Sequence, residues 1–324
     1  MADPFYDVRN AIAIGNYHQA VAEASGVKTN SRKEVEVAAF HEEKEVLIAM
    51  AQVGLGQGEA VIAQLKTATR PVLLAVREWA TFCVMLKSRS DNLQEDQLLS
   101  SQLKKLTDAA EEVNDANTQI AVLAAAALLS TGDRAGALRL AKRWLNEQKK
   151  TQIPNLIRLH LDLHAIAVEA LLRMGRPDLA RSEVKDMEQL DEESVLTLVC
   201  SGITSLYEGV KSRDEYEKAL QRFKEVSMLC GQSVFISNLT ALAHMQLGDH
   251  PTAERVLHDV LAMKSGDPDT AANLAVVSAY LDKASDATSR YTQQAVATSG
   301  AWSHSYNKVS SAFDEAVDQF KATL

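Results

Sequence analysis

The sequence has little of what β-sheets, tight turns and crosslinked folds require. Its 324 residues include only 14 glycines, 6 prolines and 3 cysteines, and aromatic residues make up 5% of the chain. A β-rich protein of this length uses many tight turns, and such turns depend on glycine and proline. Hydrophobic residues at 46% and charged residues at 24% are ordinary for a folded protein. The composition therefore favours a folded, mainly helical chain.

The cysteines exclude a disulfide framework. Cys83, Cys200 and Cys230 are odd in number and far apart, and no Cys-x-x-Cys pair occurs. Their spacing matches neither a metal-ligand pattern nor the surroundings of a cysteine nucleophile. We expect free thiols in a reducing compartment.

Long hydrophobic runs are also missing. The most apolar stretch, IAVLAAAALL at 120–129, has about half the length that a membrane-spanning helix needs. The N-terminal residues MADPFYDVRN lack the basic and apolar regions of a signal peptide. We therefore expect no direct insertion into a membrane, so any membrane association would depend on a partner.

An excess of positive charge is absent too. The chain has 34 basic and 43 acidic residues, a formal net charge of −9. Phosphate backbones and anionic bilayers repel such a chain unless it carries a separate basic face. The best basic run, 139–150, distributes its charges around a helix and beyond its end, as a solvated helix face does. We expect no nucleic-acid partner.

A short pattern recurs along the chain: a glycine, four intervening residues and an alanine. Ala219, Ala253 and Ala287 are evenly spaced at intervals of 34 residues, which is the period of the tetratricopeptide helix–turn–helix unit. The glycine–alanine pairs are Gly15 with Ala20, Gly132 with Ala137, Gly175 with Ala180, and Gly248 with Ala253.

The pattern has a physical reason. Two antiparallel helices joined by a very short turn need a residue that tolerates positive φ where the first helix ends, hence glycine. Pro177 and Pro251 stand near the first turn of the second helix, where a missing N–H costs nothing. The small alanine lets the two backbones approach. The spacing predicts an all-α, tetratricopeptide-like α-solenoid of antiparallel helix pairs, helical from near residue 4 to 322, in about eight or nine pairs.

No change of composition divides the chain, so we expect residues 1–324 to form a single helical-repeat domain. The polar region 88–117 keeps one narrow apolar stripe that is typical of an exposed helix. We expect 306–322 to form a C-terminal capping helix that covers the last apolar surface of the array. Its stripe consists of Tyr306, Val309, Phe313, Val317 and Phe320.

The sequence offers no convincing catalytic, cofactor-binding or metal-binding site. His160 and His164 lie one helical turn apart, as a metal-binding pair could, but neither an intervening glutamate nor an obvious third ligand accompanies them. The glycines of VGLGQGEAV at 53–61 lack the strand and the Lys-Ser/Thr of a phosphate loop, so a turn is favoured. No nucleophile elbow occurs. We expect a binding protein, not an enzyme.

The first helix of each pair lines the concave face of such an array. On residues 234–267 and the following unit, the repeat pattern assigns to that face six residues: Phe235, Asn238, Leu242, Met245, Val276 and Tyr280. This predicted surface is mostly apolar and lacks the lysines with which co-chaperone arrays grip a terminal carboxylate. It favours an apolar, extended or hairpin partner. The alternative is that these residues only pack against neighbouring helices.

Three stretches resemble the epsilon subunit of coatomer, the coat of Golgi-derived vesicles: 3–28, 161–209 and 244–283. The middle stretch is the most specific, with Arg-Pro-Asp-Leu-Ala-Arg at 176–181 followed by Met187 and Leu190-Asp191-Glu192. SAFDEAVDQF at 311–320 is similar to the family's last helix. Residues 143–160 look longer than the family's usual link, and 88–117 match poorly.

The resemblance implies a non-enzymatic helical array without a cofactor that curls toward a closed ring. It implies binding to the C-terminal domain of the alpha subunit of coatomer (COPI), and through it to the rest of the coat. It also implies a cytoplasmic protein on the cytosolic face of Golgi membranes, active in Golgi-to-endoplasmic-reticulum retrograde and intra-Golgi transport. The alternative is another tetratricopeptide adaptor such as a co-chaperone.

Overall fold

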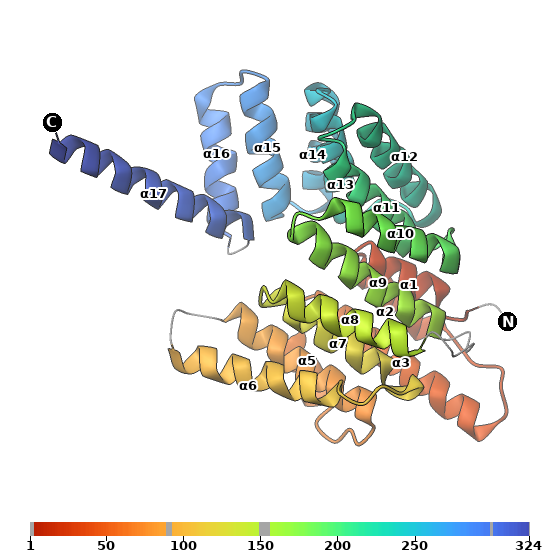
Figure 1. The fold of residues 1–324 in the computed structure, drawn as a ribbon. Coiled ribbons are helices and arrows are strands. Elements are labelled where there is room, and N and C mark those ends of the chain that lie inside the picture. Colours follow the sequence, from red (N-terminus) through yellow and green to blue (C-terminus); the bar gives the residue numbers. More distant parts are fainter. Residues whose placement is uncertain (1–2, 89–92, 149–155, 299–300, 324) are drawn as a thin grey trace. The chain divides into compact units, whose positions relative to one another are not determined.

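The chain is helical throughout the residues that the computed structural model describes, which are 3–88, 93–148, 156–298 and 301–323 (Figure 1). No strand occurs in these ranges. Contacts divide the chain into two compact units, Met1–Tyr207 and Glu208–Leu324. The unbroken composition predicts a single domain, whereas the contacts separate two units.

The first unit consists of consecutive antiparallel helices. Part of the 143–160 link, residues 149–155, lies outside the described residues. The helices are α1 (Tyr6–Ala13), α2 (Tyr17–Gly26), α3 (Glu34–Gly54), α4 (Gly58–Gln64), α5 (Pro71–Lys87), α6 (Leu93–Ala109), the short 3₁₀ helix η1 (Asp115–Asn117), α7 (Thr118–Ser130), α8 (Arg134–Gln148), α9 (Leu156–Arg173), α10 (Pro177–Asp191) and α11 (Val195–Glu208), whose last residue falls in the second unit.

The second unit continues the same arrangement and ends in a long helix. Its helices are α12 (Arg213–Cys230), α13 (Val234–Gln246), α14 (His250–Met263), α15 (Pro268–Tyr280), α16 (Ser285–Val296) and α17 (Ala301–Thr323). Helix pairing of this kind in both units is that of an α-solenoid.

The turn between α13 and α14 shows how the repeat is built. Gly248 has φ +81°, and its N–H and that of Asp249 close the end of α13 by bonds of 3.0 and 2.9 Å to the carbonyls of Met245 and His244. The Asp249 side chain then caps α14 by accepting a bond of 3.2 Å from the N–H of Thr252. Helix end and helix start thus meet within a few residues.

The alanine of each recurring pair is fully buried near the start of the second helix. Ala20, Ala137, Ala180 and Ala253 are all 0% exposed, and the four glycines of these pairs all have positive φ. A larger side chain at such an alanine would push the paired backbones apart.

Helix α7 lies at the centre of the first unit. It contains the run at 120–129, and ten of its residues are buried, so that it is apolar on every face. A helix that is hydrophobic all round belongs in a core. Its side chains pack with those of α3, α5, α6, α8 and α9 in the largest apolar cluster of this unit.

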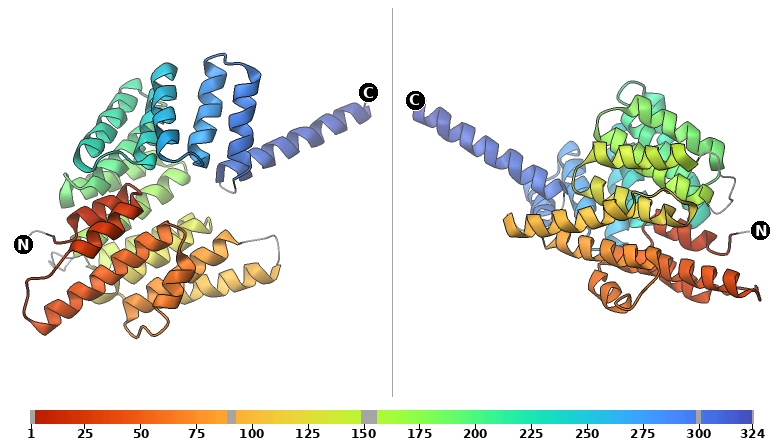
Figure 2. Two further views of the ribbon diagram at one scale, coloured as in Figure 1. Left: turned by 180° about the vertical axis from the view of Figure 1, so that it is seen from behind. Right: turned by 60° about the horizontal axis from the view of Figure 1, so that its bottom comes forward.

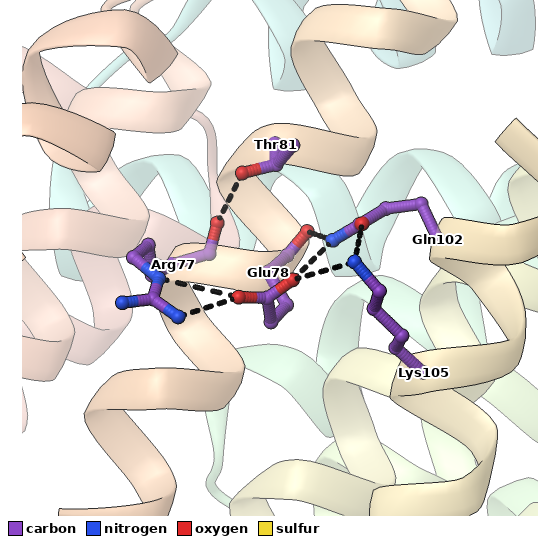
Figure 3. A network of polar contacts seen from close by, with 5 residues as sticks. All are labelled: Arg77, Glu78, Thr81, Gln102 and Lys105. Atoms are coloured by element: carbon purple, nitrogen blue, oxygen red, sulfur yellow. Dashed lines mark hydrogen bonds and ion pairs between the residues drawn. The ribbon is translucent and has the colours of Figure 1, made fainter. Parts of the chain in front are cut away.

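Helix α6 packs on α5 through more than its apolar stripe (Figure 3). The amide of Gln102, itself 3% exposed, donates to the carbonyl and to Oε2 of Glu78 at 2.9 and 2.7 Å. Arg77 donates to Oε1 of Glu78 at 2.8 Å, and Lys105 lies 4.0 Å from Oε2. Burial alone would raise the pKa of Glu78, but bonds from Gln102 and Arg77 lower it. The apolar stripe predicted for this region is buried, with Leu106 at 1% exposure.

Helix α17 does not cover the end of the array in the way we expected. Only its first turns pack against α16, and the helix then runs away from the rest of the second unit (Figure 2). The apolar stripe therefore remains open: Val309, Phe313 and Phe320 are 69%, 67% and 65% exposed. A helix that leaves its neighbours at one end cannot bury a stripe along its whole length.

Candidate partner-binding surface

Helices α13 and α15 lie side by side and carry exposed apolar groups. Phe235 on α13 is 42% exposed, and Val276 and Tyr280 on α15 are 39% and 66% exposed. The Tyr280 ring stacks on the imidazole of His250 with centroids 4.5 Å apart, which holds the tyrosine against α14. These three predicted contact residues are accessible to a partner.

Asn238 is not accessible, and the prediction that it contacts a partner is wrong. The side chain is 7% exposed, and its amide donates to Thr270 Oγ1 at 2.9 Å and accepts from Asn273 Nδ2 at 3.0 Å. It therefore joins α13 to α15, because a buried amide needs partners within the protein. Leu242 and Met245 are partly buried, and Met245 packs against the core of the second unit.

The buried bonds around Asn238 include the cap of α15. Asp267 accepts from the backbone N–H and the hydroxyl of Thr270 at 3.1 and 2.8 Å, and Lys264 lies 3.1 Å away. Burial alone would raise the pKa of Asp267, but the bonds from Thr270 and Lys264 lower it below its ordinary value. Asn238 and Asn273 thus serve to join α13 and α15.

The end of α12 adds an apolar pair that the sequence reasoning missed. Met228 and Leu229 are 88% and 57% exposed. The buried face of α12 repeats at Tyr216, Ala219, Phe223 and Val226, with steps of three and four residues. Met228 and Leu229 do not continue this alternation of three- and four-residue steps, so they do not lie on the buried face. The sequence alone contains this signal.

The two histidines of HLDLH have different partners. His160 Nε2 lies 3.1 Å from Gln148 Oε1, whereas His164 Nδ1 lies 2.9 Å from Glu183 Oε2. Lys142 pairs with the other oxygen of Glu183. Burial would raise the pKa of Glu183, but the bonds from His164 and Lys142 lower it. Glu183 thus joins α8, α9 and α10 through an ion pair with Lys142 and a hydrogen bond with His164.

Asp186 completes a group of three possible metal ligands with His164 and Glu183, whose ligand atoms lie within 4.8 Å of one another. In a zinc site each ligand atom lies about 2.0–2.2 Å from the metal. The ligand atoms of such a site therefore lie closer to one another than the 4.8 Å that spans this group. A cation would also have to compete with the ammonium group of Lys142. The histidine pair that the sequence suggested as a metal site is thus divided between two networks.

A cavity of about 120 Å³ lies within the first unit, between α1, α3, α7 and α9. Its apolar walls come from Ile12, Leu47, Met50, Leu161 and Leu196. Sequence reasoning could not find it, because its walls come from helices that are far apart along the chain.

Charged groups line the same cavity. Arg158 Nη1 lies 2.5 Å from Asp3 Oδ2, and Arg9 lies 3.6 Å from the same oxygen and also pairs with Glu43. Asp162 faces the cavity from α9 without a hydrogen bond or ion pair to any described residue. Burial raises the pKa of Asp162 to about 6, although the positive charge of Arg9 opposes this shift.

Replacing Asp162 with asparagine should stabilise the first unit at pH 7.5. Because the pKa of this acid is raised to about 6, the folded chain holds more protons than the unfolded chain between about pH 4 and pH 6. The contribution of this group to stability is thus present at acid pH and is lost as the pH rises through that window. Allowing for water that reaches the carboxylate, we expect a gain of about 1–2 kcal/mol at pH 7.5.

Urea unfolding of both chains at pH 5 and pH 7.5 would check this. The variant should be more stable at pH 7.5, and its advantage should fall to about half at pH 5, in the middle of this window. A variant that is less stable than the natural chain at pH 7.5 would show that Asp162 has a partner that supports the fold.

No helix in the described part of the chain is both long and apolar enough to cross a membrane.

The sequence matches the family described as coatomer epsilon subunit over residues 1–321. Coatomer subunit epsilon of Caenorhabditis elegans is 27% identical over 330 residues, with 99% of this chain and 100% of that protein covered. Coatomer subunit epsilon-1 of Arabidopsis thaliana is 27% identical over 292 residues, with 90% and 88% covered.

Among solved structures, a chain of the APC/C hetero-tetramer Cut9-Hcn1 is similar in fold, with a TM-score of 0.59 and 12% sequence identity. The similarity covers 90% of this chain and 51% of that chain. At this identity the likeness concerns the fold alone. The family match extends through both units and includes the exposed helix α17, and on that basis the chain belongs to the coatomer epsilon subunit family.

Proposed function

We propose that the chain is a non-enzymatic subunit of a COPI vesicle coat that binds and stabilises the C-terminal region of the coat's alpha subunit. It would act in the cytoplasm, at the cytosolic face of Golgi membranes and on coated vesicles. The transport steps that it would serve are Golgi-to-endoplasmic-reticulum retrograde and intra-Golgi traffic. The observation that carries the proposal is the family match over residues 1–321.

The second unit supports the choice of a protein partner. Large apolar side chains are exposed on α12, α13, α15 and α17, and such groups mark interaction surfaces when they lie together. Phe235, Val276 and Tyr280 would contact the partner from α13 and α15. The stripe on α17 would contact it as an amphipathic helix packs its apolar face on another chain. Contact with the alpha subunit would cover surface that is open in this chain alone.

Another adaptor, such as a co-chaperone, is the alternative function. An adaptor that binds the terminal carboxylate of a peptide requires free lysine, arginine or asparagine side chains on its binding face. Asn238 and Asn273 bond to each other between α13 and α15. This use of the two amides favours the coat subunit over a carboxylate-binding adaptor.

The proposal is tested by mixing the chain with the C-terminal region of the alpha subunit from the same organism. Size-exclusion chromatography at micromolar concentration should give one joint peak of greater mass. Separate elution of the two proteins would contradict the proposed partner. Binding to a chaperone's C-terminal peptide in calorimetry would instead support the alternative.

Replacing Phe313 with aspartate should weaken binding of the alpha subunit by at least about 10-fold, because it puts a charge on the apolar stripe of α17. Phe313 is 67% exposed, so the melting temperature of the chain alone should not change. Ser311→Asp adds the same charge on the opposite, exposed face of α17 and serves as the matched control. Calorimetric titration measures both, and equal affinities for the two variants would exclude the stripe from the interface.

A further inference from the structure

The cavity of the first unit combines two features that a basic side chain requires. Its walls of Ile12, Leu47 and Leu161 suit the methylene stem of a lysine or arginine, and carboxylates line the same space. Long basic side chains bury their stems along apolar surface while the charged head finds an anion.

The charges of the cavity leave a negative excess. Asp3 already has two partners, Arg9 and Arg158. Arg9 also pairs with Glu43. Within the described residues, Asp162 has neither an ion pair nor a hydrogen bond, although it lies on the wall of the cavity. The two arginines thus pair with other carboxylates, and the carboxylate of Asp162 remains available for a cation.

Asp191 adds a second acid where α10 ends. It is exposed, lines the same cavity and has no ion pair with any described residue. The local sum over Asp3, Arg9, Glu43, Arg158, Asp162 and Asp191 is therefore negative. Charge complementarity of this kind selects a positively charged partner and disfavours an acidic one.

From this cavity, its apolar walls and its unpaired carboxylate, we infer that the first unit receives a basic side chain of the bound partner, with Asp162 as the residue that pairs with it. The inference rests on the proposed function, because the partner is the alpha subunit's C-terminal region. It goes further in naming a site on the first unit, whereas the apolar surface proposed above belongs to the second. Asp191 would attract the same group at the mouth of the cavity.

Binding of a cation in this cavity should depend on pH through the ionisation of Asp162. Arg9 on α1 and Arg158 on α9 both pair with Asp3. Cys200 on α11 stays neutral, because burial raises its pKa to about 12. Asp162, with its pKa raised by burial to about 6, changes charge between pH 5 and pH 7.5. A cation binds it more tightly once the proton has left.

The test is a calorimetric titration of the alpha subunit's C-terminal region into the full chain, Asp162→Asn and Asp7→Asn, at pH 5 and pH 7.5. Asp7 is an exposed acid on α1 outside the cavity, so Asp7→Asn changes the net charge by the same amount. We expect Asp162→Asn to weaken binding at least about 10-fold at pH 7.5. The natural chain should bind about 10-fold more tightly at pH 7.5 than at pH 5, whereas Asp162→Asn should lose that difference.

The outcomes separate the two proposals. Equal affinity and equal pH dependence of the natural chain and Asp162→Asn would overturn the inference and leave the coat partner in place. A general loss of fold is distinguished by unfolding curves, since Asp162→Asn should be at least as stable as the natural chain.

A second measurement does not require the partner. Butylguanidinium and butylammonium, with butanol as the uncharged control, are titrated while the methyl resonances of Ile12, Leu47 and Leu161 are followed by NMR. The two cations should shift these resonances in the natural chain and not in Asp162→Asn, and their relative affinities would distinguish arginine from lysine. Shifts that are the same with butanol, or absent with all three probes, would contradict the basic side chain as occupant.

Discussion

Replacing Trp144 with alanine is expected to lower the free energy of unfolding of the first unit by about 3–5 kcal/mol. Trp144 on α8 is 0% exposed and packs within the largest apolar cluster of that unit. Its indole N–H donates to the carbonyl of Ala110 at 3.1 Å, which ties α8 to the end of α6. Alanine would leave both a cavity and a carbonyl without its donor.

Trp144→Phe is the matched control, because it keeps an aromatic ring and removes only the N–H donor and part of the volume. We expect it to cost about 1–3 kcal/mol. Urea unfolding followed by circular dichroism measures both variants. Hydrogen exchange should lose protection first in α6 and α8, since helical arrays pass stability mainly between neighbours. A loss below about 1 kcal/mol for alanine would contradict the packing described here.

Replacing Ala253 with tryptophan is expected to destabilise the second unit by a few kcal/mol, in the range of overpacked cores. Ala253 on α14 is 0% exposed and packs with Ala241 of α13 and with Leu257. An indole at this position must force the two helices apart or leave its rotamer well.

Ala262→Trp provides the control, because Ala262 lies on the exposed face of the same helix. Its melting temperature should stay close to that of the natural chain, whereas Ala253→Trp should melt well below it. An unchanged melting temperature for Ala253→Trp would mean that this alanine does not lie at the close approach of α13 and α14.

The helix pairs were largely predictable because their signals are local. The glycine of each recurring pair has a positive φ, as at Gly248 with +81°, and the alanine five residues later is buried. Both depend on a few neighbouring residues and on the 3.6-residue period of the helix. The apolar stripe of 88–117 was also predictable, although residues 89–92 lie outside the described part of the chain, but the helix against which the stripe packs was not.

The partner surface was only partly predictable. Phe235, Val276 and Tyr280 are exposed, whereas Asn238, on the same face of the pattern, is buried between α13 and α15. The position of a residue in the repeat predicts the direction in which its side chain points from its own helix. It does not say whether the neighbouring helix offers groups such as Thr270 and Asn273 that take the amide into the interior.

The sequence by itself determined the class of fold and the positions of the short turns, because turn chemistry and helical periodicity act between residues close in the chain. The family followed separately, from the resemblance of three stretches to the epsilon subunit of coatomer. The tertiary structure decided which cavities and which apolar surfaces remain exposed between and beside those helices. The cavity around Asp162 exists because α1 lies beside α9, and the stripe on α17 is exposed because that helix leaves α16 after its first turns. Burial is set by elements distant in sequence, and no local pattern contains that information.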